Sequence, residues 1–153
     1  MSHRIDTMNA DVAEGFVPLS NAGQFVSVNG PIYIRASDRS LGFRVGPAHC
    51  NPIGICHGGW LASFLDMQLP ASARHVGSLT DGFLVTVSLS LDYLSPVEVG
   101  SWVEGKATIL DRKGSLIFTQ GTATSSGSII VRGSGVYKIA RVPPLAADAK
   151  HGP

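Results

Sequence analysis

The sequence predicts an α+β fold in which a curved antiparallel β-sheet of five to six strands wraps around one long central helix. Two patterns support this prediction. One segment rich in Leu, Ala, Met and Phe lacks strand alternation and is typical of a helix, and segments that alternate between apolar and polar residues follow it. A largely apolar helix needs cover over most of its surface, and a curved sheet supplies that cover.

The predicted strands lie on both sides of this helix. Ahead of it, two short strands flank a hairpin-like turn at residues 37–40. After it, the segment from Phe83 alternates well, with valines and leucines on one face and Thr86 among the polar residues on the other. Turn sequences at residues 111–114 and 125–127 separate the remaining strands. The expected strands are residues 31–36, 41–45, 83–94, 102–110, 115–124 and 128–139.

The helix is expected at about residues 58–75, with Gly77 as a stop. Pro70 lies within it, and because proline has no backbone N–H we expect Pro70 to kink the helix or end it early. Asp66 is the only acid on the helix. At about 100° per residue it lies on a strip of small residues, which leaves room for a ligand or another backbone. The alternative is a solvated or hydrogen-bonded surface acid. The strip consists of Gly59, Ala62, Ser63 and Ala73.

Composition indicates one packed domain. The chain has 153 residues, of which 44% are hydrophobic and 15% are charged, which argues against disorder. We expect a single domain over residues 16–142, with flexible ends at residues 1–15 and 143–153. The formal net charge of +1 gives no broad field for nucleic acid or an anionic membrane, so neither is an expected partner.

The N-terminal segment lacks the basic start and apolar run of a signal peptide. No apolar run is long enough to span a bilayer. We therefore expect a cytoplasmic protein in which Cys50 and Cys56 are reduced thiols.

The helix begins at His57-Gly58-Gly59. Free N–H groups at a helix start can bind a developing oxyanion, although two glycines can also simply form a turn. Gly58 and Asp66 are eight residues apart, hence about 12 Å along the axis. A base or nucleophile must lie within about 3 Å of the group on which it acts. If both groups act on one carbonyl, they must come from different subunits of a dimer.

The same residues carry a resemblance to a known family. Asn51, Gly54 and His57-Gly58-Gly59 match the pattern Asn-x-x-Gly-x-x-His-Gly-Gly, and Asp66 follows the histidine by 66 − 57 = 9 residues. Asp92-Tyr93-Leu94-Ser95-Pro96 is similar to the family's strand ending. Over roughly residues 30–140 the chain resembles the phenylacetyl-CoA thioesterase (PaaI-like) branch of the 4-hydroxybenzoyl-CoA thioesterase superfamily, whose members have the hotdog fold.

The resemblance implies an acyl-CoA thioesterase that hydrolyses an acyl- or aryl-CoA to the free acid and CoA. It implies that the Gly58 N–H binds the thioester oxygen, beside His57 and Asn51. It also implies that Asp66 of the partner subunit acts as general base or nucleophile. Thr86 falls where relatives place a Ser or Thr that hydrogen-bonds the water or the acid, although its strand face need not look at the helix.

Further residues are candidates for contacts with the substrate. No cofactor is expected, because coenzyme A arrives as part of the substrate. We expect a homodimer that forms the site and that stacks as a dimer of dimers into a homotetramer. Basic side chains near turns could meet the CoA phosphates. The candidate substrate- and CoA-binding residues are Gly59, Ser88, Tyr93, Arg112, Lys113 and Lys138.

Other functions compete with this one. His49-Cys50 and Cys56-His57 offer four potential metal ligands, but their spacing is not a familiar zinc pattern, so no metal site is expected. Cys56 beside His57 could be a nucleophile, although buried hydrophobic cysteines are the more common case. A non-catalytic acyl-ligand binding protein and a hotdog dehydratase or hydratase also remain open.

Overall fold

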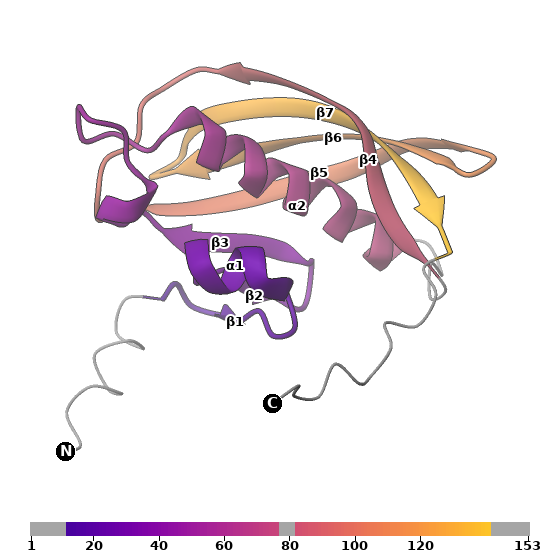
Figure 1. Ribbon diagram of the computed structural model, residues 1–153, viewed down its shortest axis with the longest axis horizontal. Helices are drawn as coiled ribbons and strands as arrows, with labels where there is room; N and C mark the ends of the chain where they lie inside the picture. Colours follow the sequence, from indigo (N-terminus) through magenta and orange to yellow (C-terminus); the bar gives the residue numbers. More distant parts are fainter. Residues whose placement is uncertain (1–11, 77–81, 142–153) are drawn as a thin grey trace, which may run out of the picture.

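The computed structural model describes residues 12–76 and 82–141 (Figure 1). One long helix lies against the inner face of a strongly curved sheet, and a short helix covers the first strands (Figure 1). In chain order the elements are β1 (Val17–Pro18), α1 (Gly23–Asn29), β2 (Tyr33–Arg35), β3 (Ser40–Arg44), η1 (Pro47–His49), α2 (Gly58–Val76), β4 (Phe83–Tyr93), β5 (Trp102–Lys113), β6 (Leu116–Ser125) and β7 (Ser128–Ala140).

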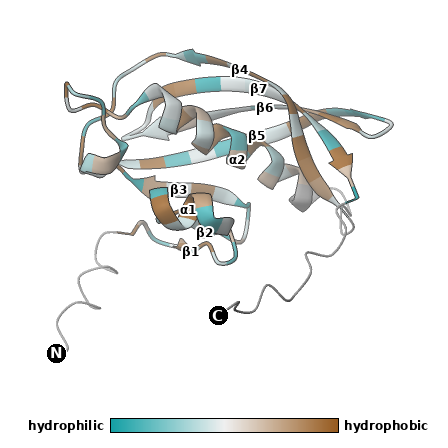
Figure 2. Ribbon diagram, in the orientation of Figure 1, coloured by the Kyte–Doolittle hydropathy of each residue, from teal (hydrophilic) through white to brown (hydrophobic). Residues whose placement is uncertain are grey.

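The sheet confirms the predicted fold class. Its strand order is β1-β2-β3-β5-β6-β7-β4, and all neighbours are antiparallel. The two-residue β1 brings the sheet to seven strands, one more than the upper end of the prediction. The core lies between α2 and the sheet, where Phe64, Leu65 and Leu69 are fully buried. Hydrophobic and hydrophilic residues alternate along the long strands (Figure 2).

The central helix has the predicted position and passes through its proline. α2 runs from Gly58 to Val76, and Pro70 lies inside it. The early end expected at Pro70 is therefore wrong, since the helix continues for more than a turn beyond it. The predicted stop at Gly77 lies outside the described residues.

The strand after the helix has one irregularity that matters for function. The pairing of β4 with β7 shifts register between Thr86 and Ser88, which is a β-bulge. Before the bulge, Leu84 is buried; after it, Leu89 and Leu91 are the partly buried residues. The predicted unbroken alternation, with Val85 and Leu89 on one face, is therefore wrong, because the extra residue at the bulge exchanges the two faces.

Of the two turns predicted between the last three strands, the one at residues 125–127 is confirmed. The one at residues 111–114 lies further along the chain, because residues 111–113 belong to β5 and only Gly114 and Ser115 form the loop. Ser125 pairs with Ser128, so Ser126 and Gly127 form a two-residue hairpin loop. Both have positive φ, 49° and 80°, as a type I′ turn requires. The chain therefore reverses tightly between β6 and β7.

The helix α1 was not predicted. Its Val26 is buried, and its last residue, Asn29, accepts a hydrogen bond from His49 Nε2 at 2.6 Å. The Phe25 ring lies 6.4 Å from the Trp60 ring at the start of α2. Contacts with residues far along the chain thus hold α1 in place.

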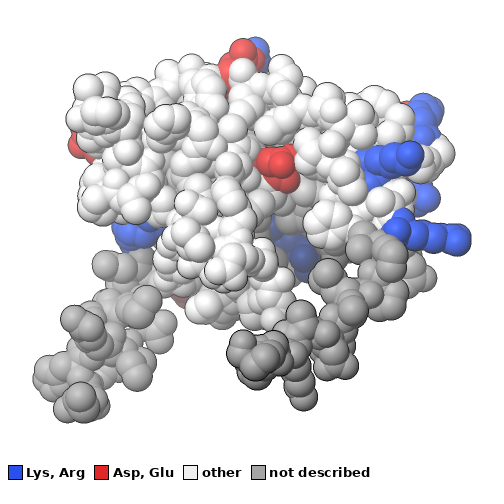
Figure 3. Space-filling model, in the orientation of Figure 1, with Lys and Arg blue, Asp and Glu red and all other residues white. Residues whose placement is uncertain are grey.

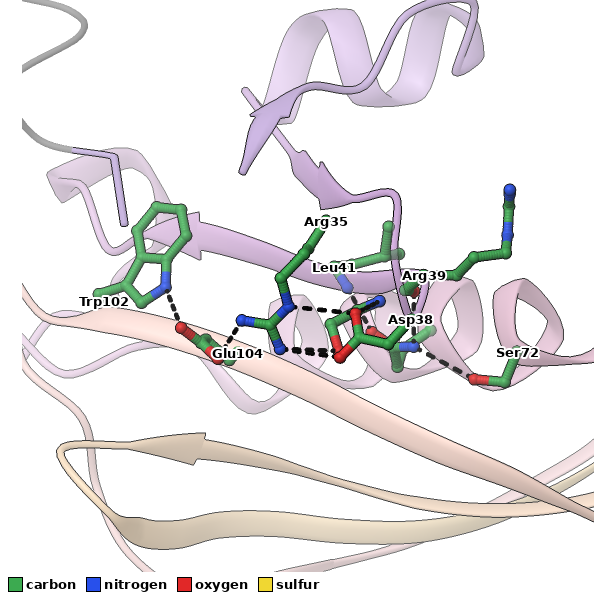
Figure 4. A network of polar contacts seen from close by, with 9 residues as sticks. Arg35, Asp38, Arg39, Leu41, Ser72, Trp102 and Glu104 are labelled. Carbon is green, nitrogen blue, oxygen red and sulfur yellow. Dashed lines mark hydrogen bonds and ion pairs between the residues drawn. The ribbon is translucent and has the colours of Figure 1, made fainter. Parts of the chain in front are cut away.

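A polar network joins the turn between β2 and β3 to the middle of α2 (Figure 4). The fully buried Gln68 accepts a hydrogen bond from the Leu41 N–H at 2.6 Å and donates to the Arg39 carbonyl at 3.3 Å. On the outer side of the turn, Arg35 donates to both carboxylate oxygens of Asp38, at 3.1 and 2.9 Å. The network fixes the β2–β3 hairpin relative to the helix that carries Asp66.

The two predicted flexible ends fall almost entirely outside the described residues, which leave out residues 1–11 and 142–153. In the described ranges, no helix combines the length and apolarity that crossing a membrane requires.

Candidate active site

Asp66 is half-buried on α2, and two hydroxyl groups hold one of its carboxylate oxygens. Thr86 Oγ1 donates to Asp66 Oδ1 at 2.8 Å, and the Tyr137 hydroxyl donates to the same oxygen at 2.9 Å. In the described part of the chain, no group donates to Oδ2. One oxygen of the carboxylate is therefore fixed, and the other is available to a water or substrate.

The bulge explains why Thr86 reaches Asp66. Thr86 pairs directly with Tyr137 across β4 and β7, so their side chains lie side by side on the face toward α2. Ser88, on the far side of the bulge, pairs with Val136 and is exposed. The alternating pattern of the strand could not predict whether Thr86 contacts Asp66.

Tyr137 is a site residue that the sequence reasoning missed. Its side chain is fully buried, and its hydroxyl also lies 3.5 Å from the Asp66 carbonyl oxygen. Burial, followed by the nearby Asp66 carboxylate, raises the pKa of the Tyr137 phenol well above its usual range. The hydroxyl therefore keeps its proton and stays a hydrogen-bond donor. Its only sequence signal was a tyrosine on the last strand.

The start of α2 has one unused donor. His57 Nδ1 accepts from the Gly59 N–H at 2.8 Å, and the His57 carbonyl accepts from Trp60 and Leu61 at 3.0 and 3.1 Å. His57 thereby caps the helix. The Gly58 N–H donates to no group in residues 12–76 and 82–141. It lies at the positive end of the helix dipole, where an anionic oxygen is stabilised.

Tyr93 fixes the orientation of Gly58. Its hydroxyl donates to the Gly58 carbonyl at 2.6 Å. A Cβ added at Gly58 would lie only 3.2 Å from Tyr93 Cζ. A glycine therefore allows this close approach. Tyr93, predicted to bind substrate, is placed beside the predicted oxyanion donor.

Asn51 lies in the loop that leads into α2. Its Oδ1 accepts from the Ile53 and Ile55 N–H groups at 3.1 and 3.3 Å. Its side-chain NH₂ has no partner in the described residues. An isolated antiparallel β-bridge, formed by the backbones of the free cysteines Cys50 and Cys56, closes this loop beside His57. Asn51 and His57 therefore approach the helix start from the same loop.

A small cavity lies between α1 and the first turns of α2. Its volume is about 280 Å³. Aromatic rings of Phe25 and Trp60 line it, together with His57, Gly59 and Ser63 from the start of α2. A larger hollow of about 790 Å³ lies on the opposite, outer face of the sheet and contains none of the predicted catalytic residues. The smaller cavity lies at the start of α2, since His57 and Gly59, the two neighbours of Gly58 in the chain, both line it.

The predicted basic residues lie away from the start of α2. Lys113 pairs with Leu116 and Leu116 with Lys138, so the two lysines share one row across the sheet. Lys and Arg side chains gather at this end of the viewed face, by the β5–β6 hairpin (Figure 3). Lys113 forms an ion pair with Asp111 at 3.0 Å, and Arg112 Nε donates to the Gly114 carbonyl at 3.1 Å.

The two cysteines behave as structural residues. Cys56 is buried, and burial raises its pKa to about 12, which disfavours the nucleophilic thiolate. Cys50 Sγ lies 3.4 Å from the Gly46 carbonyl. Among the described residues, no group of three or more His, Cys, Asp or Glu side chains could hold a metal ion.

Comparison with known proteins places the chain in a family. The sequence model of the family described as thioesterase superfamily matches residues 53–130. A Pseudomonas aeruginosa protein named "Putative esterase PA0474" is 31% identical over 133 residues, covering 84% of this chain and 98% of that protein.

Two solved structures have the same fold. The BH2602 protein of Bacillus halodurans, crystallised with CoA, has a TM-score of 0.69 at 22% identity, covering 82% of this chain and 83% of its own. The PaaI protein of E. coli, from the phenylacetic acid degradation operon, has a TM-score of 0.60 at 16% identity, covering 66% and 71%. The antiparallel sheet curved around α2 is thus a hotdog fold, and the chain belongs to the thioesterase superfamily, whose enzymes hydrolyse thioesters.

Proposed function

We propose that this protein is an acyl-CoA thioesterase that hydrolyses an acyl- or aryl-CoA to the free acid and CoA at a site shared by two protomers. Asp66 of one protomer acts on the thioester, and the Gly58 N–H of its partner binds the thioester oxygen. The observation that carries the proposal is that one helix holds both an Asp66 Oδ2 that accepts no hydrogen bond and a Gly58 N–H that donates none, within residues 12–76 and 82–141. The two lie about 12 Å apart along one helix, so one chain cannot apply both to one carbonyl.

The Thr86 hydroxyl favours a general-base role for Asp66 over direct attack. A hydroxyl has one hydrogen, and Thr86 donates it to Asp66 Oδ1. A water bound at this site can therefore only donate hydrogen bonds to Thr86 Oγ1 and to Asp66 Oδ2, since both oxygens act as acceptors. A water between them directs both hydrogens to the protein and a lone pair to the thioester carbon. Mass spectrometry of enzyme quenched during turnover should detect no acyl adduct, whereas an acylated Asp66 would establish direct attack.

The edge strand β4 supports a dimer. In the described sheet β4 pairs with β7 on one side only, and it exposes Phe83, Val85 and Val87 by 55%, 45% and 57%. An exposed apolar edge favours pairing with another strand. Antiparallel pairing of two β4 strands about a two-fold axis continues the sheet and turns each Asp66 toward the partner's α2. Two such dimers are expected to stack into a tetramer.

The small cavity fits the acyl end of the substrate. It adjoins Gly58, and its volume of about 280 Å³ lies at the lower limit of small-molecule sites, about 300–1,000 Å³. Its aromatic lining therefore suits a short or aromatic acyl group. Substituting Phe25→Ala should shift preference toward longer acyl chains in a panel of acyl-CoAs, and an unchanged preference would exclude this location. The CoA phosphates are assigned to Arg112, Lys113 and Lys138, with Gly59, Ser88 and Tyr93 as further substrate contacts.

The decisive experiment measures thiol release from a panel of acyl-CoAs. We expect Asp66→Asn to lower kcat by several powers of ten while circular dichroism shows an intact fold. Hydrolysis at the wild-type rate by this variant would exclude the mechanism. If wild-type protein binds acyl-CoA but hydrolyses no thioester, the chain is a binding protein instead.

A matched pair of substitutions tests the oxyanion donor. Gly58→Pro and Gly58→Ala both add a Cβ against Tyr93, but only proline removes the N–H. Proline is tolerated at the first position of a helix. We expect Gly58→Pro to lose about 10²- to 10³-fold in kcat relative to Gly58→Ala. Equal activity of the two variants would refute the role of this N–H.

A further inference from the structure

Tyr137 contacts Asp66 at two points, which makes it a candidate for more than packing. Its hydroxyl donates to Asp66 Oδ1 at 2.9 Å and lies 3.5 Å from the Asp66 carbonyl oxygen. In a regular helix the N–H four residues later would bind that carbonyl. Here that residue is Pro70, which has no N–H. Pro70 therefore leaves the Asp66 carbonyl without its helical hydrogen bond. That carbonyl lies beside the Asp66 carboxylate to which the Tyr137 hydroxyl donates.

The Tyr137 ring packs in a space that its neighbours on the sheet leave for it. The side chain is fully buried, and it projects from β7 directly beside Thr86 of β4. A Cβ on Gly135 would lie 2.7 Å from Tyr137 Cε2 and 3.0 Å from its hydroxyl. The absence of a side chain at position 135 therefore makes room for the ring. Thr119 Oγ1 donates to the Gly135 carbonyl at 3.0 Å and holds that backbone in place.

We propose that Tyr137 is a positioning residue for hydrolysis, which together with Thr86 fixes Oδ1 of Asp66 and so presents Oδ2 to the attacking water. The inference rests on the proposed function of Asp66. Two donors on one oxygen leave the carboxylate a single orientation, and their location on the sheet side directs the other oxygen away from the core.

The contacts of Asp66 allow the contribution of Tyr137 to be measured separately from those of other titratable groups. Among the described residues, Tyr137 is the titratable group that touches Asp66, and no Lys, Arg or His forms an ion pair with it. The raised pKa of the Tyr137 phenol keeps the hydroxyl protonated across the working range. Tyr137 therefore acts on Asp66 as a hydrogen-bond donor throughout that range.

The test is Tyr137→Phe, which keeps the ring and removes the hydroxyl. Loss of a hydrogen bond to a charged group predicts a fall in kcat of roughly 10- to 100-fold. KM should change far less, because Tyr137 orients the carboxylate and does not itself bind the substrate. Tyr33→Phe is the matched control, because Tyr33 is also buried but packs against Trp102, away from Asp66. Tyr33→Phe should leave both kcat and KM unchanged.

The outcomes separate the inference from the function on which it rests. A wild-type kcat in Tyr137→Phe, with Asp66→Asn inactive, would overturn the role of Tyr137 and leave the thioesterase mechanism standing. Full activity of Asp66→Asn would overturn both. If Tyr137→Phe does not fold, Gly135→Ala displaces the ring while keeping the hydroxyl, and it should lower kcat with little change in KM. A wild-type kcat in that variant would contradict the inference.

Discussion

Two carboxylates on this chain have opposite surroundings. Asp66 accepts hydrogen bonds from the neutral hydroxyls of Thr86 and Tyr137. Asp38 lies against the Arg35 guanidinium, which donates to both of its oxygens. The hydrogen bonds from Arg35 lower the pKa of Asp38 to about 2. Asp38 therefore stays ionised as a structural charge, whereas Asp66 is placed near uncharged donors.

The lowered pKa of Asp38 predicts a pH-dependent stability. Because the folded value of about 2 lies below the ordinary value of 3.8, ionised Asp38 stabilises the fold above pH 3.8, and this contribution is lost as the pH falls toward 2. We expect wild type to melt at a higher temperature than Asp38→Asn near neutral pH. The difference should shrink between about pH 4 and pH 2, as thermal unfolding across that range can show. A constant difference would contradict the ion pair.

The buried hydrogen bonds of Gln68 lead to a second prediction about stability. It is buried and binds the Leu41 N–H and the Arg39 carbonyl. Gln68→Leu keeps a similar volume but leaves these backbone groups unpaired, so it should cost about 1–3 kcal/mol in the free energy of unfolding. Gln120 is exposed on β6, so Gln120→Leu should change that free energy by less than about 0.5 kcal/mol. Urea unfolding measures both, and equal effects would show that the buried bonds contribute nothing.

Single residues of the site differ in how far sequence alone could place them. The spacing of Gly58 and Asp66 on one helix follows from the 3.6-residue period, so their separation could be predicted. Thr86 could be suspected from family resemblance but not oriented, because a bulge is invisible in an alternating pattern. Tyr137 could not be found, since its contact with Asp66 depends on the register of β7 against β4.

At the level of elements, the predicted strands agree with the structure because each is bounded by turn residues and shows a period of two. The helix α1 has seven residues, which is too short to be stable alone or to show a clear period. Three contacts stabilise α1: Val26 packs in the core, Phe25 stacks on Trp60, and Asn29 binds His49. Such long-range contacts leave no local signal in the sequence.

The edge strand β4 yields a prediction at this level. The double substitution of Val85 and Val87 by lysine places charges on the unpaired edge, which opposes pairing with a second copy. Light scattering should show the loss of the dimer, and thiol release should fall with it although Asp66 and Gly58 are untouched. Val28→Lys is the control, because Val28 is 71% exposed on α1, and it should stay dimeric and active. A fully active monomer would refute the shared site.

For the whole molecule, mixing two inactive variants tests the division of the site between chains. Asp66→Asn and Gly58→Pro each damage both sites of their own homodimer. In a mixed dimer, one site combines an intact Asp66 with the partner's intact Gly58, and the other combines both defects. After random exchange at equal amounts, half of the dimers are mixed and each has one working site. The mixture should recover about a quarter of wild-type thiol release, and no recovery would place both groups in one chain.

The continuous helix α2 has a consequence for how two such sites would communicate. It begins at Gly58 and carries Asp66 two turns later, without a break at Pro70. In the proposed dimer each helix begins at one site, with Gly58, and passes beside the other, with Asp66. A displacement of α2 along its axis that brings the Gly58 N–H toward a bound thioester moves Asp66 at the second site by the same distance. Substrate binding at one site would then alter the catalytic distance at the other, so the two active sites are expected to show cooperative kinetics.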